Sequence, residues 1–322
     1  MIVENAVQLT EAVVHEMRHT EDARVRDILE SLVRHLHAFA REVKLTEPEF
    51  DAAIRLVTDL GQKTTPSHNE VRLMAGSLGL STLVCLMNNG EGSIDGEVET
   101  SANLLGPFWR VNSPVTPNGG SIVRSDTTGE AMFFDCVVVD QAGEPMFFTG
   151  VVVDKAGQPV AHAEVDVWHA STVGLYENQD PAQAEMNLRG KFFTDKDGRF
   201  AFRSIKPSGY PVPMGGPVGK LLTVQKRHPF RPAHLHCLIH KAGYKTIASQ
   251  LYSSDDPMLE SDAQFGVTRP LIARYVRHQN EPAPNGEALP AWWSLEHRFV
   301  LEPGVEWLPT PPVSAKAEAP VA

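Results

Sequence analysis

A series of short apolar runs separated by tight turns, which begins near residue 147, constrains the fold of this chain more than any other feature. Val151-Val152-Val153 leads into Asp154-Lys155-Ala156-Gly157, and Phe192-Phe193-Thr194 leads into Asp195-Lys196-Asp197-Gly198. Between them lies Val165-Asp166-Val167-Trp168, in which the valines stand at alternate positions with a polar residue between them. Strands with one buried face alternate in this way, and turns with glycine between such runs indicate hairpins. The pattern predicts an antiparallel sandwich or barrel.

The first 90 residues have the period of helices instead. From Asp22 to Val43 the apolar residues recur at steps of mostly three and four, as on one face of a helix. Thr46-Glu47-Pro48-Glu49 is a capping box with a proline in the first turn, so a second helix is predicted to begin there and to end at Gly61. A third helix is predicted over about residues 68–87.

These patterns together predict an α+β fold class that is mainly β. An N-terminal helical domain and a linker rich in proline and glycine are expected over residues 1–105, to which the resemblance described below adds dimerisation. An antiparallel β-sandwich domain, catalytic by the same resemblance, is expected over 106–308, and its last strands are marked by tryptophans. Residues 309–322, with three prolines and a run of Ala, Lys and Glu, are expected to form a disordered tail.

Composition and charge exclude several classes of function. The formal net charge of -11 over 322 residues suits a nucleic-acid partner poorly. No apolar run approaches the roughly 18 residues that cross a bilayer, and the N-terminus does not have the pattern of a secretory signal. Cys85, Cys136 and Cys237 are well separated and odd in number, so they predict a reducing cytoplasm rather than a disulfide framework.

Two motifs match known sites without the residues that those sites need. His15-Glu16-Met17-Arg18-His19 fits the H-E-x-x-H signature of zinc peptidases, but Asp22 and Val25 stand where the extended signature has glycine and histidine. Gly215-Gly216-Pro217-Val218-Gly219-Lys220 lacks the upstream glycine and the downstream hydroxyl of a phosphate loop. The first is interpreted as chance helix composition, with a zinc peptidase as the weaker alternative, and the second as a loop.

The stretch Arg231-Pro232-Ala233-His234-Leu235-His236 predicts a metal site. It reads as a strand, and side chains two residues apart leave a strand by the same face, so the two histidines can share one ion. Alone, this pair could hold zinc, copper or nothing. Tyr176 and Tyr210 lie in segments bounded by glycine and proline that could close around the same ion. Two phenolates are hard anionic ligands, so they favour a hard trivalent ion such as Fe(III).

These motifs occur in the order of a known family. They are Leu105-Gly106-Pro107-Phe108, Val167-Trp168-His169-Ala170 followed by Gly174-Leu175-Tyr176, Pro207-Ser208-Gly209-Tyr210, the Arg231 to His236 stretch, and Gln250. The region from about Leu104 to Val267 resembles the intradiol ring-cleavage dioxygenases, which cut a catechol ring between its two hydroxyl-bearing carbons with a non-haem Fe(III). The N-terminal helices are similar to the dimerising domain of the cytoplasmic branch of this family.

The resemblance implies a role for each site residue. Tyr176, Tyr210, His234 and His236 would be the iron ligands, with hydroxide in the fifth place and Tyr210 and His236 as the axial pair. The substrate diol would bind through both oxygens, and Tyr210 would leave the metal and take up a diol proton. Arg231 would stabilise charge on the ring, with Gln250 beside it. The N-terminal helices would form a homodimer whose hydrophobic channel can hold a phospholipid.

The choice of substrate stays open between branches. Leu105-Gly106-Pro107-Phe108, Cys237, and Ala263 within Ser261–Val267 are similar to the hydroxyquinol 1,2-dioxygenase branch and would bind the substrate. This implies that 1,2,4-trihydroxybenzene is converted to 3-hydroxy-cis,cis-muconate. Trp168-His169-Ala170 is more similar to the catechol branch, and Cys85 stands where an acidic pocket residue is expected. Catechol, or a chlorinated or methylated catechol, is the alternative, and a non-catalytic β-sandwich binding module is the alternative from another class.

Overall fold

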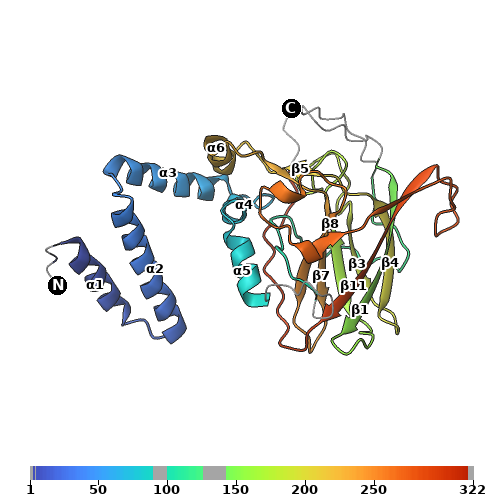
Figure 1. Ribbon diagram of the computed structural model, residues 1–322, viewed down its shortest axis with the longest axis horizontal. Helices are drawn as coiled ribbons and strands as arrows, with labels where there is room; N and C mark the ends of the chain where they lie inside the picture. Colours follow the sequence, from blue (N-terminus) through green and yellow to red (C-terminus); the bar gives the residue numbers. More distant parts are fainter. Residues whose placement is uncertain (1–2, 4, 90–99, 126–142, 318–322) are drawn as a thin grey trace. The chain divides into compact units, whose positions relative to one another are not determined.

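The computed structural model describes residues 3, 5–89, 100–125 and 143–317 of the chain (Figure 1). The contacts between Cα atoms divide it into two compact units, Met1–Asp59 and Leu60–Ala322. The three-part domain organisation with boundaries at 105/106 and 308/309 stays a prediction. Cys136, one of the three cysteines, lies outside the described residues.

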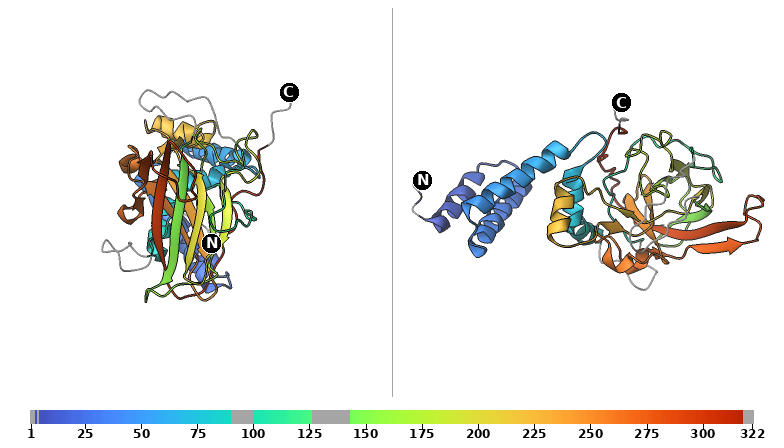
Figure 2. Two further views of the ribbon diagram at one scale, coloured as in Figure 1. Left: turned by 90° about the vertical axis from the view of Figure 1, so that its right-hand side faces the viewer. Right: turned by 90° about the horizontal axis from the view of Figure 1, so that it is seen from above.

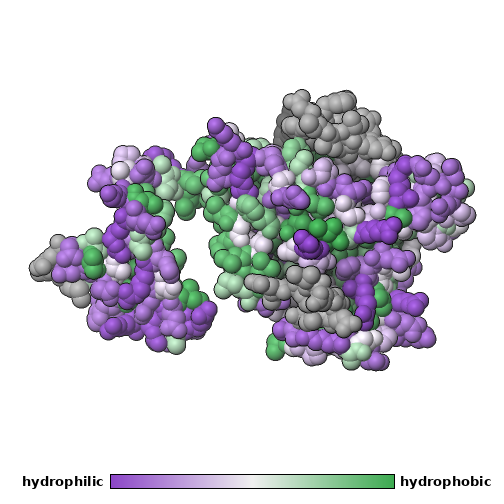
Figure 3. All heavy atoms as spheres, in the orientation of Figure 1, coloured by the Kyte–Doolittle hydropathy of each residue, from purple (hydrophilic) through white to green (hydrophobic). Residues whose placement is uncertain are grey.

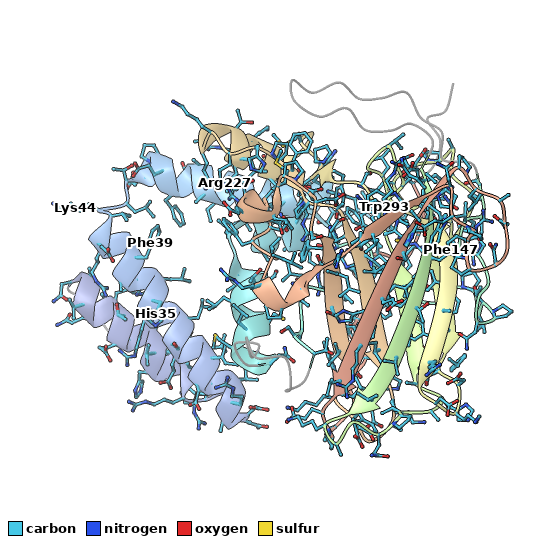
Figure 4. The ribbon with its side chains drawn as sticks, turned by 45° about the vertical axis from the view of Figure 1, so that its right-hand side comes forward. His35, Phe39, Lys44, Phe147, Arg227 and Trp293 are labelled. Atoms are coloured by element: carbon cyan, nitrogen blue, oxygen red, sulfur yellow. The ribbon has the colours of Figure 1, made fainter. Side chains whose placement is uncertain are left out.

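The first unit consists of α1 (Ala6–Met17), α2 (Ala23–Glu42) and most of α3 (Glu47–Lys63). Asp22 caps α2 by accepting a hydrogen bond from the Val25 N–H at 2.9 Å. α2 has no buried residue, and most apolar side chains on its stripe are about half exposed, among them Leu36 and Phe39 at 54%, while Leu29 and Val33 are partly buried. Figure 4 shows Phe39 one turn from His35 on this helix. The stripe was predicted from the sequence, and among the described residues it is only partly covered.

The predicted start of α3 at Thr46–Glu49 is confirmed, with the Glu49 side chain making its half of the capping box. The Thr46 N–H donates to Glu49 Oε2 at 2.9 Å, and the Thr46 hydroxyl donates to the same oxygen at 2.8 Å. The predicted end at Gly61 is wrong, because α3 continues to Lys63. A glycine inside a helix costs only about 1 kcal/mol, so it does not end a helix by itself.

The single helix predicted over residues 68–87 is two helices, α4 (Glu70–Ser77) and α5 (Leu80–Asn89), which meet at an angle of 74°. Gly79 has a φ of +74°, the left-handed conformation in which helices commonly end. Among the described residues no single helix has the length and apolarity of a membrane span, while this bent pair meets the two criteria when it is taken together.

Two sheets of the second unit face each other. The four-stranded sheet has the order β10-β11-β1-β4 and contains β1 (Pro145–Asp154), β4 (Arg199–Ile205), β10 (Val276–Gln279) and β11 (Ala291–Leu301). The five-stranded sheet has the order β3-β2-β7-β8-β9 and contains β2 (Glu164–Trp168), β3 (Arg189–Phe193), β7 (His234–His240), β8 (Ile247–Ser253) and β9 (Ile272–Ala273). Figure 2 shows the long strands of the first sheet side by side, and Phe147 and Trp293 are labelled on two of them in Figure 4.

The predicted mainly β sandwich with N-terminal helices is confirmed, although the sheets are mixed rather than purely antiparallel. β1 and β11 pair in parallel, as do β8 and β9, and the other neighbours are antiparallel. The two turns that were predicted to close hairpins do not join neighbouring strands of one sheet. The turns Asp154–Gly157 and Asp195–Gly198 lead from one sheet to the other, because β1 and β4 belong to one sheet and β2 and β3 to the second. The turn residues define the local reversal, but not which sheet the next strand joins.

The period of two along β7 separates two environments. Leu235, Cys237 and Ile239 belong to the apolar core between the sheets. His234 and His236 therefore point to the opposite face of the five-stranded sheet. Cys237 is fully buried in the core. Its predicted role in substrate binding is wrong, because it projects from the other face of the strand.

Residues Gly215–Lys220, predicted to be a loop, include the start of a helix. α6 (Pro217–Val224) begins after Gly216. The carboxylate of Glu70, a fully buried residue of α4, lies at its N-terminus, where Oε1 accepts a hydrogen bond from the Val218 N–H at 2.9 Å. Its Oε2 lies 2.5 Å from His68 Nε2. A protein carboxylate thus occupies the end of the helix that would attract a phosphate.

The last described residues differ from the predicted disordered tail. The Ser314 N–H donates to the Pro66 carbonyl at 2.8 Å, the Ala317 N–H donates to the Asn178 carbonyl at 2.8 Å, and Val313 is 2% exposed. Residues 309–317 are therefore packed on the second unit, since backbone hydrogen bonds and one buried apolar side chain hold them. The remainder of the tail, 318–322, lies outside the described residues.

Candidate metal centre

Four side chains converge on the outer face of the five-stranded sheet. His234 and His236 come from β7, and Tyr176 comes from the loop after β2. Tyr210 begins the short strand β5 (Tyr210–Pro211), which pairs with β6 (Phe230–Arg231) so that Tyr210 faces Arg231. We call these four side chains the four-donor cluster. Each is at most 3% exposed.

Oxygen and nitrogen atoms of the cluster lie close around one point. Tyr176 Oη is 3.0 Å from Tyr210 Oη and 3.0 Å from His236 Nε2. His234 Nε2 is 3.1 Å from His236 Nε2. It is also 3.4 Å from Tyr210 Oη and 3.5 Å from Tyr176 Oη. An ion with bonds of about 2.1 Å holds neighbouring ligands roughly 3 Å apart, so these separations fit a shared metal.

A glycine and two strand pairings bring the four donors together. Gly174 has a φ of +75°, and a Cβ there would lie 2.8 Å from Tyr210 Cβ, so the loop of Tyr176 can approach β5 this closely only with glycine. Trp168 pairs with His236 across β2 and β7, and the two rings stack with centroids 4.7 Å apart. Close backbone approach and sheet pairing thus bring the donors together.

Burial controls the protonation of the cluster. It raises the pKa of Tyr176 well above the usual 10, helped by the neighbouring Tyr210, and it also raises the pKa of Tyr210 against the opposing effect of Arg231. Burial and the charge of Arg231 lower the pKa of His234 to about 3. Burial lowers the pKa of His236 well below its usual value, and the neighbouring His234 and Arg231 lower it further. The imidazoles are therefore neutral, and the phenols need a strong cation to ionise.

The donor set suits a hard cation. The Nδ1 atom of His234 lies 2.6 Å from the Pro232 carbonyl, which fixes Nε2 as the atom with the free lone pair. Two neutral imidazoles and two phenols that a trivalent ion would deprotonate leave one positive charge. In the described parts of the chain no group of three or more His, Cys, Asp and Glu side chains could hold a metal. The alternative of a zinc peptidase site at His15 and His19 is not supported, since α1 ends at Met17 and His19 lies outside the helix.

Arg231 lies next to the four-donor cluster, and hydrogen bonds hold its guanidinium group in place. Its NH1 group is 3.3 Å from His234 Nε2. On its other side Nε and NH2 donate to the two carboxylate oxygens of Asp262 at 3.0 and 3.1 Å. NH2 also donates to Gln250 Oε1 at 3.0 Å and to the Tyr252 hydroxyl at 2.9 Å. Burial opposes the charge of Arg231, but Asp262 raises the pKa of the guanidinium well above its usual value, so it stays protonated.

Gln250 connects this arginine to the wall of the site. It lies on β8 in register with His236, and Tyr252 lies in register with His234. Its Nε2 donates to the Leu104 carbonyl at 2.7 Å, while Oε1 accepts from Tyr252 at 2.6 Å. Both ends of the amide are therefore used to hold neighbours in place.

A cavity of about 590 Å³ adjoins the cluster. A Cβ at Gly106, one of its lining residues, would lie 3.1 Å from His236 Cε1, so the wall at this point is a single backbone thick. The lining is mainly apolar and comes from α4, α5 and several loops: Arg72, Ala75, Gly76, Leu80, Ser81, Val84, Cys85, Asn88, Asn89, Ala102, Asn103, Leu104, Leu105, Gly106, Pro107, Leu238, Thr246, Ala248, Gln264, Trp307 and Pro309. Figure 3 shows hydrophobic side chains gathered over α4 and α5. Among the lining residues that the structure describes, none is acidic.

The other predicted pocket residues have different positions. Leu105 and Pro107 line the cavity together with Gly106. Phe108 packs on Tyr176, with ring centroids 4.6 Å apart, and does not line the cavity. Ala263 is buried between the two residues of its loop that do contact the site, Asp262 and Gln264.

Sequence reasoning missed three residues of the site, Asp262, Tyr252 and Gln264. Tyr252 follows Gln250 by two positions in one strand, so the period of two could have identified it. Asp262 and Gln264 lie in the segment Ser261–Val267 that the resemblance marked, but it assigned a role only to Ala263, because the groups that the two residues contact lie far away along the chain.

A β-sandwich that carries two buried phenols and two imidazoles around one point has the donor set of a metal centre. Comparison with known proteins agrees. The family model described as "Dioxygenase" matches residues 128–291, and "Catechol dioxygenase N terminus" matches residues 22–93. A hydroxyquinol 1,2-dioxygenase of Rhizobium sp. (strain MTP-10005) is 37% identical over 90% of this chain and 93% of its own length.

Two further relatives extend the comparison. An intradiol ring-cleavage dioxygenase of Aspergillus niger is 36% identical over 85% of this chain and 83% of its own length. The crystal structure of a hydroxyquinol 1,2-dioxygenase from Pseudomonas putida DLL-E4 superposes with a TM-score of 0.78 and 35% identity, and covers 93% of this chain and 99% of that one. The chain belongs to the intradiol ring-cleavage dioxygenase family, whose members are non-haem iron enzymes.

Proposed function

We propose that the four-donor cluster binds Fe(III) and that the chain cleaves hydroxyquinol by intradiol ring opening. The observation that carries the proposal is the convergence of two phenol oxygens and two imidazole nitrogens, with five of the six donor pairs at 3.0–3.5 Å. Tyr176, Tyr210, His234 and His236 would hold the metal. When bound, Fe(III) would supply the Lewis acidity that activates the diol ring toward O2.

The side chains around the metal have separate tasks. The Tyr210 phenolate oxygen is the proposed acceptor of a diol proton, since burial favours its neutral form. Arg231 is proposed to stabilise negative charge that develops on the ring, because it is buried, protonated and adjacent to His234. Gln250 is proposed to orient the arginine, since its Oε1 accepts from NH2.

Hydroxyquinol is the proposed substrate because the relatives named for it cover nearly the whole chain. Catechol is the second candidate, and the absence of an acidic side chain from the described lining favours it, since a third hydroxyl has no carboxylate partner there. Cys85 does line the cavity, half-buried, with its carbonyl accepting from Asn89 Nδ2 at 2.9 Å. Leu105, Gly106 and Pro107 are the proposed wall on the metal side.

The first unit is proposed to form a homodimer, within a dimerisation domain that covers residues 1–105. The half-exposed apolar stripe of α2 supports this, because a helix with no buried residue needs a surface to cover it. A phospholipid in the interface is part of the same proposal. A cytoplasmic location is also proposed, and it agrees with the unpaired thiols of Cys85 and Cys237.

Oxygen uptake tests the proposal directly. The purified protein, loaded with iron, is expected to consume O2 with hydroxyquinol and to give a product with the absorbance of a hydroxymuconate, and kcat/KM for catechol is expected to be lower. A higher kcat/KM for catechol would overturn the choice of substrate. A colourless protein that binds zinc instead of iron and consumes no O2 with either diol would overturn the activity.

A further inference from the structure

Gly76 and Gln264 occupy one position in the wall of the cavity. Gly76 lies in α4, and a Cβ built on it would overlap Oε1 of Gln264 and lie 2.9 Å from its Cδ. The amide of Gln264 therefore fills the space that any side chain at position 76 would take. Both residues line the cavity, together with Gly106, whose other side faces His236.

Three hydrogen bonds fix Gln264 in this place. Its Nε2 donates to the Ser77 hydroxyl at 2.7 Å, and its backbone N–H donates to Asp262 Oδ1 at 3.1 Å. Its carbonyl accepts from the Thr82 hydroxyl at 3.3 Å. Asp262 is the residue that pairs with Arg231. The side chain, 5% exposed, is thus part of one bonded network with the charged group beside the metal site.

The polarity of this amide determines what it can bind. Because Nε2 donates to Ser77, Oε1 is the atom left to accept a hydrogen bond, and the surrounding lining is mainly apolar. A buried acceptor that meets a C–H or C–Cl group loses its hydrogen bond, whereas a hydroxyl group restores it. A site built to hydrogen-bond a hydroxyl discriminates strongly against the analogue that lacks it.

We propose that Gln264, held in place by the absence of a side chain at Gly76, is the specificity-determining residue that accepts a hydrogen bond from the third ring hydroxyl of the substrate. This inference rests on the proposed function and supplies a hydrogen-bond partner for the third hydroxyl in a cavity whose described lining has no acidic residue. The neutral amide accepts this hydrogen bond without the desolvation cost of a buried carboxylate.

Substitution of Gln264 by methionine tests the inference, since it removes the acceptor and keeps the length of the side chain. We expect kcat/KM for hydroxyquinol to fall about 10-fold to 100-fold while the value for catechol stays within about twofold. Anaerobic titration, followed by the visible absorption of the iron–phenolate chromophore, is expected to show the same selective loss in Kd. Gln279→Met, the same change at an exposed residue of β10, is the control.

Gly76→Ala is the second variant, and it leaves Gln264 itself unchanged. Alanine is favourable in a helix, but its Cβ must displace the amide. We expect the same loss of selectivity, and little further loss in the double variant with Gln264→Met. A hydroxyquinol-to-catechol ratio that stays within twofold of the unsubstituted protein in both variants would overturn the inference and leave the proposed function intact. An unsubstituted enzyme that cleaves neither compound would overturn both.

Discussion

The four-donor cluster and the wall of the adjoining cavity are built in different ways. Three of the four donors lie on paired strands, and all four side chains are at most 3% exposed. The cavity wall comes largely from α4, α5 and loops, and its outer members such as Val84 and Leu80 are half exposed. The difference teaches that the chemistry depends on the sheet, while selectivity depends on elements attached to it by a few side chains. One region can therefore change while the other is kept.

Removal of one metal donor is expected to have the largest effect, and it tests whether the four-donor cluster carries the chemistry. Tyr176→Phe or His234→Ala is expected to abolish iron binding and reduce activity to background, because a phenolate or imidazole ligand has no substitute in the buried site. Metal analysis and the red-brown iron–phenolate absorption provide the measurement. Tyr244→Phe, which changes a tyrosine at the edge of the core, is the matched control and should keep both. Normal iron content in both donor variants would contradict the ligand assignment.

Arg231→Ala separates catalysis from metal binding within the cluster region. We expect iron to be retained and kcat to fall about 10²-fold to 10³-fold, the usual cost of losing one buried group that stabilises charge in the transition state. Arg269→Ala, at an exposed position, should change neither quantity. Stopped-flow measurement of single turnovers distinguishes the chemical step from product release. Unchanged turnover would show that Arg231 only pairs with Asp262.

Glu70 provides a smaller test in the helical wall. Burial would raise the pKa of Glu70, but His68 and the Val218 N–H outweigh it and hold the pKa below its usual 4.5. A carboxyl with a lowered pKa stabilises the fold above its unfolded-state pKa, and this contribution is lost as the pH falls through the folded-state value. Glu70→Gln is expected to cost about 1–2 kcal/mol at pH 7, with the difference from the unsubstituted protein shrinking below about pH 4.

Urea unfolding at several pH values measures this effect. Glu260→Gln, at an exposed position, is the control. Since Glu70 does not touch the four-donor cluster, iron content should be unchanged in either variant. A loss of stability that is the same at pH 3.5 and pH 7 would show that the carboxylate charge is not what stabilises the end of α6.

Part of this site follows from local patterns. His234 and His236 could be assigned to one face because the period of two acts within a single strand. The same period places Cys237 on the opposite face, and the prediction that it binds substrate is wrong because its side chain lies in the core between the sheets. The single helix expected over residues 68–87 failed at Gly79, where a left-handed glycine ends α4.

Contacts between distant segments could not be predicted in this way. The pairing of Arg231 with Asp262 and the shared space of Gly76 and Gln264 depend on how loops pack against helices. Turn residues likewise marked the reversals after β1 and β3, but the choice between sheets is made by burial of whole strands.

The sequence by itself determined the donor types, the helical and β-rich halves, and the family, because residue chemistry and periodicity are local properties. The tertiary structure decided that five pairs of donors lie within 3.5 Å, that Arg231 is paired before substrate arrives, and that the amide of Gln264 takes the place of a side chain at Gly76. Each of these needs segments that are far apart in the chain to be packed to within a few ångströms, and only the folded core imposes that distance.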